Sequence, residues 1–124
     1  MAGYRIDRVS EDIKREIVAV IRELKDPRVR DKLLTVVRVD VNSDASAAKV
    51  YISALEGMET AQTAVKGLVA ATGFIRREVG QRLHLRKTPE LKFIADDSVA
   101  HGMSIIKKID DLNAEKDGDS THDD

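Results

Sequence analysis

A helical pattern of apolar residues runs through residues 58–85 and is interrupted near its middle by Ala71, Thr72 and Gly73. Glycine costs about 1 kcal/mol relative to alanine inside a helix, and β-branched threonine is also a weak helix former. One unbroken helix of this length would also be long for a small domain. The sequence therefore predicts two helices that meet at a kink at residues 71–73.

Four other segments have clear periodicity. Apolar residues spaced three and four apart predict a helix from residue 6 to about residue 24, before Pro27. Alternating apolar and polar residues predict strands at 33–41 and 47–55, which form an antiparallel hairpin, and a third strand at 88–96. A short helix is predicted from Ser98 to about residue 109.

These elements define an α+β fold in the order α-β-β-α-kink-α-β, with a short C-terminal helix and a three-stranded sheet packed on helices. Two helices that meet at a short glycine-containing joint are the arrangement of a type II KH-like domain, although KH domains hold the nucleic-acid backbone with a Gly-x-x-Gly loop. Here the joint is Ala-Thr-Gly. The alternation in the first strand places Val37, Val39 and Val41 on one face. Phe74 and Phe93 fit the core pattern, which leaves no exposed aromatic platform for stacking bases.

Charge is distributed unevenly along the chain. The 124 residues include 21 basic and 22 acidic side chains, but residues 110–124 carry a net charge of −6 and the rest of the chain +5. We therefore predict one domain at 1–109 that binds a polyanion, followed by a disordered acidic tail at 110–124.

The positive charge is concentrated after the kink, since residues 71–94 carry a net charge of +4. A new helix would begin at the kink, and the free backbone N–H groups of a helix N-terminus attract anionic oxygen atoms. The sequence predicts an RNA-binding surface made by the kink and the basic residues after it: Ala71, Thr72, Gly73, Arg76, Arg77, Arg82, Arg86, Lys87 and Lys92. Arg76 and Arg77 are predicted to face outward.

Enzymatic chemistry has little support. The densest group of reactive side chains, residues 96–101, contains Ser98 and His101, but adjacent residues at a strand end and a helix start point in diverging directions. Asp97 and Ser98 are instead predicted to cap the following helix, with His101 in its first turn. The chain has no cysteine, no histidine spacing suited to zinc and no glycine-rich phosphate loop, so no metal or cofactor is predicted. The absence of a secretory signal and of a membrane-length apolar run predicts a cytoplasmic protein.

Three stretches of residues 4–110 resemble the ribosome-binding factor A family: LKDPRV, SDASAAKVYIS and ATGFIRREVGQRLHLRKTPELKFIADDS. This family replaces the Gly-x-x-Gly loop by an Ala-x-Gly kink, which corresponds to Ala71, Thr72 and Gly73. The resemblance implies a monomeric, non-enzymatic factor that binds the free, immature 30S subunit and its 16S rRNA. It also implies a role in late maturation and 5′-end processing of the 16S rRNA precursor, in growth in the cold, and release by an assembly GTPase. The alternative is a protein-interaction module whose basic helix docks on an acidic protein surface or on its own acidic tail.

Overall fold

A computed structural model describes the backbone of residues 2–123 and the side chains of residues 8–113. Within that range the chain forms four helices and three strands: α1 (Ala2–Glu23), β1 (Leu34–Val41), β2 (Ala47–Ala54), α2 (Met58–Ala70), α3 (Thr72–Leu83), β3 (Glu90–Asp96) and α4 (Ser98–Asp123). The predicted α+β class and the predicted order of elements are confirmed.

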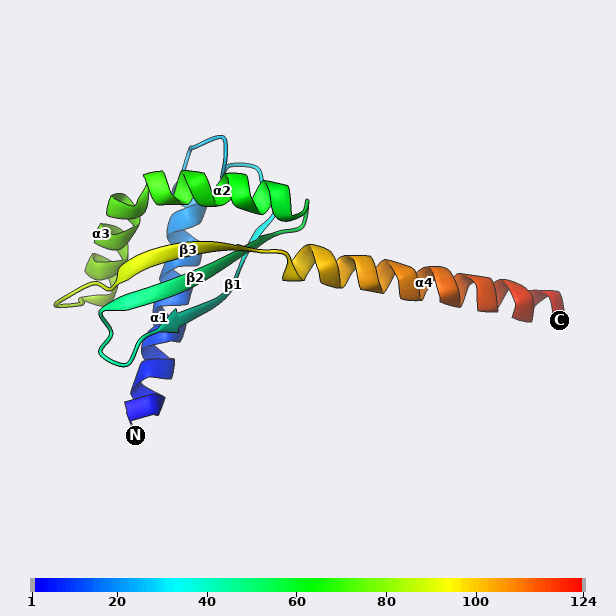
Figure 1. Ribbon diagram of the computed structural model, residues 1–124, viewed down its shortest axis with the longest axis horizontal. Coiled ribbons are helices and arrows are strands. Elements are labelled where there is room, and N and C mark those ends of the chain that lie inside the picture. The colour runs from blue at the N-terminus through cyan, green and yellow to red at the C-terminus, as the bar shows by residue number, and fades with distance from the viewer. Residues whose placement is uncertain (1, 124) are drawn as a thin grey trace.

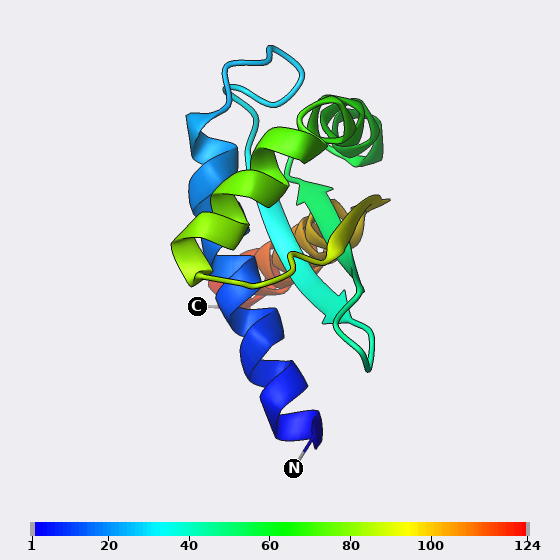
Figure 2. The same cartoon turned by 90° about the vertical axis from the view of Figure 1, so that its left-hand side faces the viewer.

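The three strands form one sheet in the order β1-β2-β3. β1 and β2 pair antiparallel, and β3 joins β2 in parallel. Helix α1 packs against β1 and α3, while α2 packs against β2 and β3. Figure 1 looks onto the sheet with α1 behind it, and Figure 2 shows α1, α2 and α3 gathered around the same face. This is the predicted type II KH-like arrangement, and it leaves the other face of the sheet open.

The core lies between the sheet and the three helices. Each of these elements contributes side chains to it at the spacing of its own secondary structure, three and four residues apart in the helices and two apart in β2. The fully buried aliphatic residues are Ile13, Ile17, Val20, Val50, Ile52, Leu68, Ile75 and Val79. Val50, Ile52 and their neighbours Ala48 and Ala54 form the predicted inward face of β2.

Strand β1 differs from the predicted alternation. The pairing of β1 with β2 shifts between Val36 and Arg38, which marks a β-bulge. A bulge adds one residue to one strand and reverses the side of the residues beyond it. Val36 and Val39 are therefore buried, whereas Val37 is only half-buried, so the prediction that Val37 shares one face with Val39 is wrong.

The kink between α2 and α3 lies at Ala71, one residue before the predicted Thr72-Gly73 break. Ala71 has φ −97° and ψ 8°, and its N–H donates to the carbonyl groups of Gly67 and Leu68. The Thr72 hydroxyl donates to the Leu68 carbonyl at 3.2 Å. Gly73 has no neighbour within 4 Å of a built Cβ. The bend therefore lies within the predicted kink at 71–73 and depends on Ala71 and Thr72, while no close contact at Gly73 requires a glycine there.

Two other glycines permit close packing. A Cβ at Gly67 of α2 would lie 2.8 Å from Val29 Cγ2, and a Cβ at Gly80 of α3 would collide with the Thr88 hydroxyl. Gly67 thus lets the loop of residues 24–33 approach α2, and Gly80 lets the loop of residues 84–89 approach α3. Both contacts fix loops that carry basic residues.

Helix α4 is longer than predicted. It extends from Ser98 to Asp123 as one helix of 26 residues, so the prediction of a short helix is wrong, and the backbone at 110–123 is helical where disorder was predicted. Figure 1 shows α4 projecting away from the rest of the domain. Residues Ile105, Ile106, Ile109 and Leu112 recur at helical spacing and extend the helical pattern past residue 109, and each is at least 44% exposed.

The loop that joins α1 to β1 is organised by Asp26. Its carboxylate accepts hydrogen bonds from the Arg28 backbone N–H at 2.8 Å and from the Arg28 guanidinium at 2.7 Å. Its backbone carbonyl accepts from the N–H groups of Val29 and Arg30. The side-chain hydrogen bonds from Arg28 lower the pKa of Asp26 from 3.8 to about 2.

This pKa leads to an expected acid sensitivity. Because the folded pKa of Asp26 lies below its unfolded value, its contribution to stability is present above about pH 4 and is lost as the pH falls through about 2. We expect the Tm of the wild type to fall more steeply between about pH 4 and pH 2 than that of Asp26→Asn. Thermal melts of both proteins across this range measure the difference. Parallel Tm curves for the two proteins would contradict the assigned role.

Candidate RNA-binding surface

Three basic residues lie free on the surface at α3 and the loop that follows it. Arg77, Arg86 and Lys87 are exposed, and none of them forms an ion pair with another side chain in residues 8–113. We call these three residues the α3 basic set.

The loop of residues 84–89 is attached to α3 at both ends. The Leu85 N–H donates to the Gly80 carbonyl at 2.9 Å, and the Arg76 guanidinium donates to the carbonyls of Thr88 at 2.9 Å and Pro89 at 3.1 Å. Positions 76 and 80 lie on either side of Arg77 along the helix. The attachments therefore hold Arg86 and Lys87 alongside α3 at the level of Arg77.

Arg76 and Arg82 belong to the same helix but are bound within the protein. Arg76 is half-buried against the loop, so the prediction that it faces outward is wrong. Arg82 bonds Glu23 at 2.8 Å and Glu78 at 3.2 Å, and it lies 3.9 Å from Glu16. The hydrogen bonds to Glu23, and then to Glu78, raise the pKa of Arg82. Arg82 therefore joins α3 to α1, and its charge is balanced by three carboxylates.

Lys92 lies elsewhere, on the open face of the sheet. It alternates with buried Leu91 and Phe93 along β3, and its register partner on β2 is Lys49. On the same face the Arg38 guanidinium lies 4.3 Å from the centre of the Tyr51 ring. The structure therefore separates Lys92 from the α3 basic set by the thickness of the sheet, and it places there a second cation, Lys49, that sequence reasoning missed.

Phe74 is the other residue that sequence reasoning misplaced. It was predicted to be in the core with Phe93, but Phe74 is 39% exposed while Phe93 is buried. The buried stripe of α3 consists of Ile75 and Val79, and Phe74 lies outside that stripe. Phe74 and Arg77 are three residues apart on one helix, so their side chains are neighbours on its surface. The helical phase of Ile75 and Val79 is the signal that could have placed Phe74 outside.

The kink residues contribute backbone rather than side chains to this surface. Thr72 uses its hydroxyl for the bond to Leu68, and Ala71 is half-buried. Gly73 is exposed in the first turn of α3, but backbone N–H groups at the kink donate to the carbonyls of Gly67, Leu68 and Val69 at the end of α2. This end of α3 thus presents an aromatic ring, Phe74, and an arginine, Arg77, rather than free N–H donors.

The group at residues 96–101 has structural contacts. The Asp96 carboxylate accepts from the Ser98 N–H at 2.6 Å, and the hydroxyl of buried Ser53 accepts from the Val99 N–H at 3.1 Å. Hydrogen bonding with the Ser98 side chain, and then with the Ser98 backbone N–H, lowers the pKa of Asp96. His101 is exposed. These bonds fix the start of α4 to the sheet, and in the described residues no three acidic or histidine side chains are grouped as a metal site.

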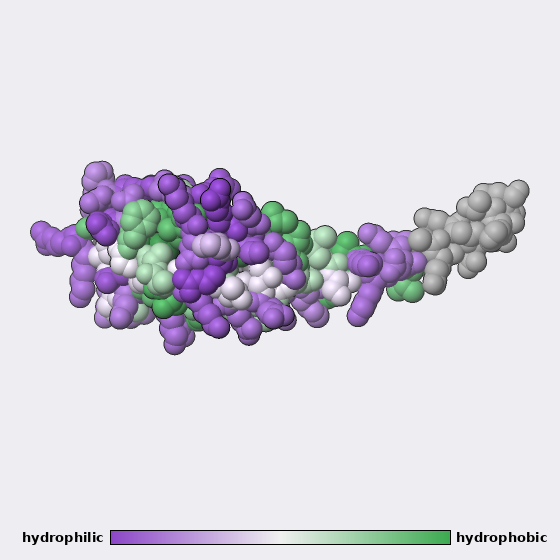
Figure 3. Space-filling view, turned by 90° about the horizontal axis from the view of Figure 1, so that it is seen from above, coloured by the Kyte–Doolittle hydropathy of each residue, from purple (hydrophilic) through white to green (hydrophobic). Residues whose placement is uncertain are grey.

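Among the described helices, none combines the length and the apolar character that a membrane crossing requires. Figure 3, which shows the domain from above, has mostly polar side chains with smaller apolar patches on the body and along α4.

The fold and this surface define a KH-like α+β domain with a basic helix and loop beside an Ala-x-Gly kink. The family model for ribosome-binding factor A matches residues 5–109. The ribosome-binding factor A of Acetivibrio thermocellus is 46% identical over 115 residues, which cover 92% of this chain and 93% of that protein. The chain belongs to the ribosome-binding factor A family.

Solved structures agree with this assignment. The crystal structure of ribosome-binding factor A from Thermus thermophilus superposes with a TM-score of 0.64 at 29% identity, covering 73% of this chain and 93% of that one. A homology model of the Thermus thermophilus factor, fitted into a cryo-EM map of a 30S complex, matches with a TM-score of 0.56 at 31% identity, over 67% of this chain and 86% of that one.

Proposed function

We propose that this chain binds the 30S ribosomal subunit by contacting its 16S rRNA with the surface formed by Gly73, Phe74 and the α3 basic set. The observation that carries this proposal is a set of three exposed cations without ion pairs on α3 and the loop after it, of which Arg77 lies next to the exposed ring of Phe74. Phosphates suit the cations, and an unpaired base suits the ring of Phe74. Ala71 and Thr72 shape the surface, and Arg76 and Arg82 position it. Lys92 contributes from the open face of the sheet.

The finer role that we propose follows from family membership. The chain acts as a monomer in the cytoplasm on the immature subunit, without catalysing a reaction. It supports late maturation and 5′-end processing of the 16S rRNA precursor, growth in the cold depends on it, and an assembly GTPase releases it. Holding an RNA end in a conformation that a separate nuclease cuts requires no catalytic group in this chain.

Salt dependence tests the proposal. If Arg77, Arg86 and Lys87 each contact one phosphate, the logarithm of the association constant falls with the logarithm of salt concentration with a slope of about −2 to −3. Co-sedimentation of the full chain with purified small subunits at increasing salt measures this slope, and fluorescence anisotropy with protein-free 16S rRNA fragments repeats it. A chain that binds subunits but no protein-free RNA would instead support the protein-interaction alternative, for which α4 offers exposed apolar residues.

A further inference from the structure

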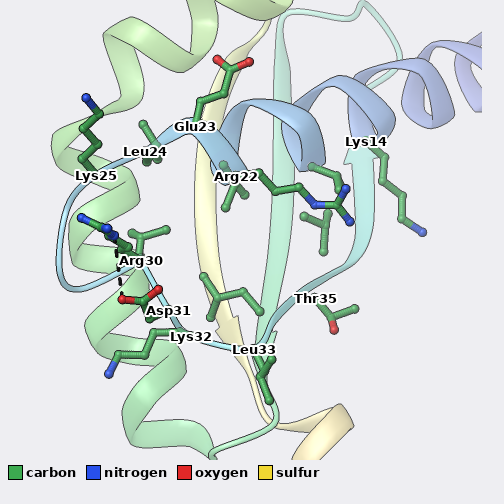
Figure 4. A pocket seen from close by; sticks show the side chains of 15 residues that line it. Lys14, Arg22, Glu23, Leu24, Lys25, Arg30, Asp31, Lys32, Leu33 and Thr35 are labelled. Atoms are coloured by element: carbon green, nitrogen blue, oxygen red, sulfur yellow. Dashed lines mark ion pairs between the residues drawn. The ribbon is translucent and has the colours of Figure 1, made fainter.

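A groove of about 900 Å³ lies between α1, the loop of residues 24–33 and the start of β1. Its apolar lining is formed by partly or fully buried side chains, except for Leu33, which is 60% exposed. Around this lining stand five cations and two acids: Lys14, Arg22, Lys25, Arg30 and Lys32, with Glu23 and Asp31. Figure 4 shows Lys14 and Arg22 extending from α1 on one side and Lys25, Arg30 and Lys32 from the loop on the other.

The positive charges of the groove are not balanced within the protein. Arg30 lies 3.8 Å from Asp31, and Glu23 is bonded to Arg82. Among the described side chains, Lys14, Arg22, Lys25 and Lys32 form no ion pair. Cations that line one hollow without acidic partners give it a positive potential, which favours an anionic ligand.

The groove is distinct from the surface at α3. Successive residues of a helix are rotated by about 100°. Lys14, Val18 and Arg22 therefore form one stripe of α1, while Glu16, which lies 3.9 Å from Arg82 of α3, is on the opposite side of the helix. Glu23 at the end of α1 lines the groove and bonds Arg82. The groove cations and the α3 basic set face different sides of α1.

The loop of residues 24–33, which carries Lys25, Arg30 and Lys32, is held in one conformation. Asp26 closes its first turn, and Val29 packs against Gly67 of α2. At its other end the Leu33 N–H donates to the Glu56 carboxylate at 3.1 Å, and Asp31 adopts a left-handed φ of 63°. A preformed loop loses little entropy when a ligand binds. These contacts explain the loop's conformation, but not why its exposed side chains are Lys25, Arg30 and Lys32.

We propose that this groove is a second RNA-binding surface, which holds a single-stranded segment with its phosphates on the basic side chains and a base against the apolar lining at Leu33. A regularly spaced polyanion matches cations placed on both sides of a hollow, and unstacked bases match an apolar lining next to the guanidinium of Arg22. This inference rests on the proposed function and places a separate part of the RNA on the far side of α1.

The test is the triple variant Arg22→Glu, Lys25→Glu and Lys32→Glu in the full chain. All three residues are exposed and unpaired, so the Tm of the variant is expected to stay close to that of the wild type. Its affinity for a labelled single-stranded RNA and for small subunits is expected to fall at least about tenfold, with a salt slope weaker by about 2.

The matched control Arg8→Glu, Lys107→Glu and Lys108→Glu changes the net charge equally and is expected to keep its affinity within about twofold. Leu33→Ala is expected to weaken binding by about threefold without changing the salt slope, because it removes an apolar contact and no charge.

Each other outcome overturns the inference in a different way. Equal losses in the triple variant and its control would mean that only net charge matters. An unchanged triple variant beside a defective α3 basic set would leave the proposed function intact and remove the groove from it. If the wild type bound no RNA, both proposals would fail. Loss of subunit binding with full retention of affinity for protein-free RNA would assign the groove to an acidic protein surface.

Discussion

Simultaneous charge reversal of Arg77, Arg86 and Lys87 to Glu is expected to reduce affinity for the small subunit by about 100-fold or more. Loss of three phosphate contacts at roughly 1 kcal/mol each corresponds to a factor of about 100, and the introduced carboxylates repel the same phosphates. The salt slope should weaken by about 2 to 3, because these three contacts release counterions. Fold stability should not change, since all three side chains are exposed and unpaired. Co-sedimentation and anisotropy at several salt concentrations measure both effects.

Two comparisons make this expectation specific. Reversal of Arg8, Lys107 and Lys108 gives the same net charge and should leave binding nearly unchanged. Arg76→Glu and Arg82→Glu should instead lower the Tm, because they break the bonds to the Thr88 and Pro89 carbonyls and to Glu23 and Glu78. Normal subunit binding by the α3 triple variant would exclude the proposed surface.

Much of the fold followed from periodicity. Helical spacing identified α1, and alternation identified β2 and β3, because burial on one face forces a pattern of about 3.6 or of 2 residues. The bulge after Val36 was missed because no residue type marks it, and it depends on the pairing with β2. The length of α4 was missed because the acidic composition of 110–124 was given more weight than the spacing of Ile105, Ile109 and Leu112.

The candidate site was less accessible to sequence reasoning. A net charge shows how many cations a segment has, but not which carboxylates from distant segments meet them. Arg82 and Glu23 are 59 positions apart, and their contact depends on how α1 crosses α3. The groove was missed for the same reason, because Arg22 and Lys32 come from different elements and converge only in the folded chain. Pro27 did indicate that the helix ends between them.

Gly67 of α2 and Gly73 of α3 provide the second large expected effect. Replacing each by alanine is expected to change the free energy of unfolding in opposite directions. Gly67→Ala places a methyl group 2.8 Å from Val29 Cγ2 and 3.3 Å from Arg28 Cβ, whereas Gly73→Ala places one in open space. Both substitutions gain about 1 kcal/mol of helix propensity. Overpacking costs about 1–3 kcal/mol, so the free energy of unfolding of Gly67→Ala is expected to lie about 1–3 kcal/mol below that of Gly73→Ala. Urea denaturation of both variants and the wild type measures this difference.

The same pair of variants distinguishes two explanations of the kink. If the bend depended on Gly73, then Gly73→Ala would lose both stability and RNA affinity. Because the bend lies at Ala71, we expect this variant to match or exceed the wild type in stability and to bind RNA normally. Gly67→Ala should also weaken binding at the groove, since it displaces the loop that presents Lys25 and Lys32.

Val29→Ala combined with Gly67→Ala removes the clash, so the double variant should be more stable than the sum of its single changes implies. Equal losses of stability in Gly67→Ala and Gly73→Ala would refute this account, because helix propensity contributes equally to both and only the contact with Val29 separates them.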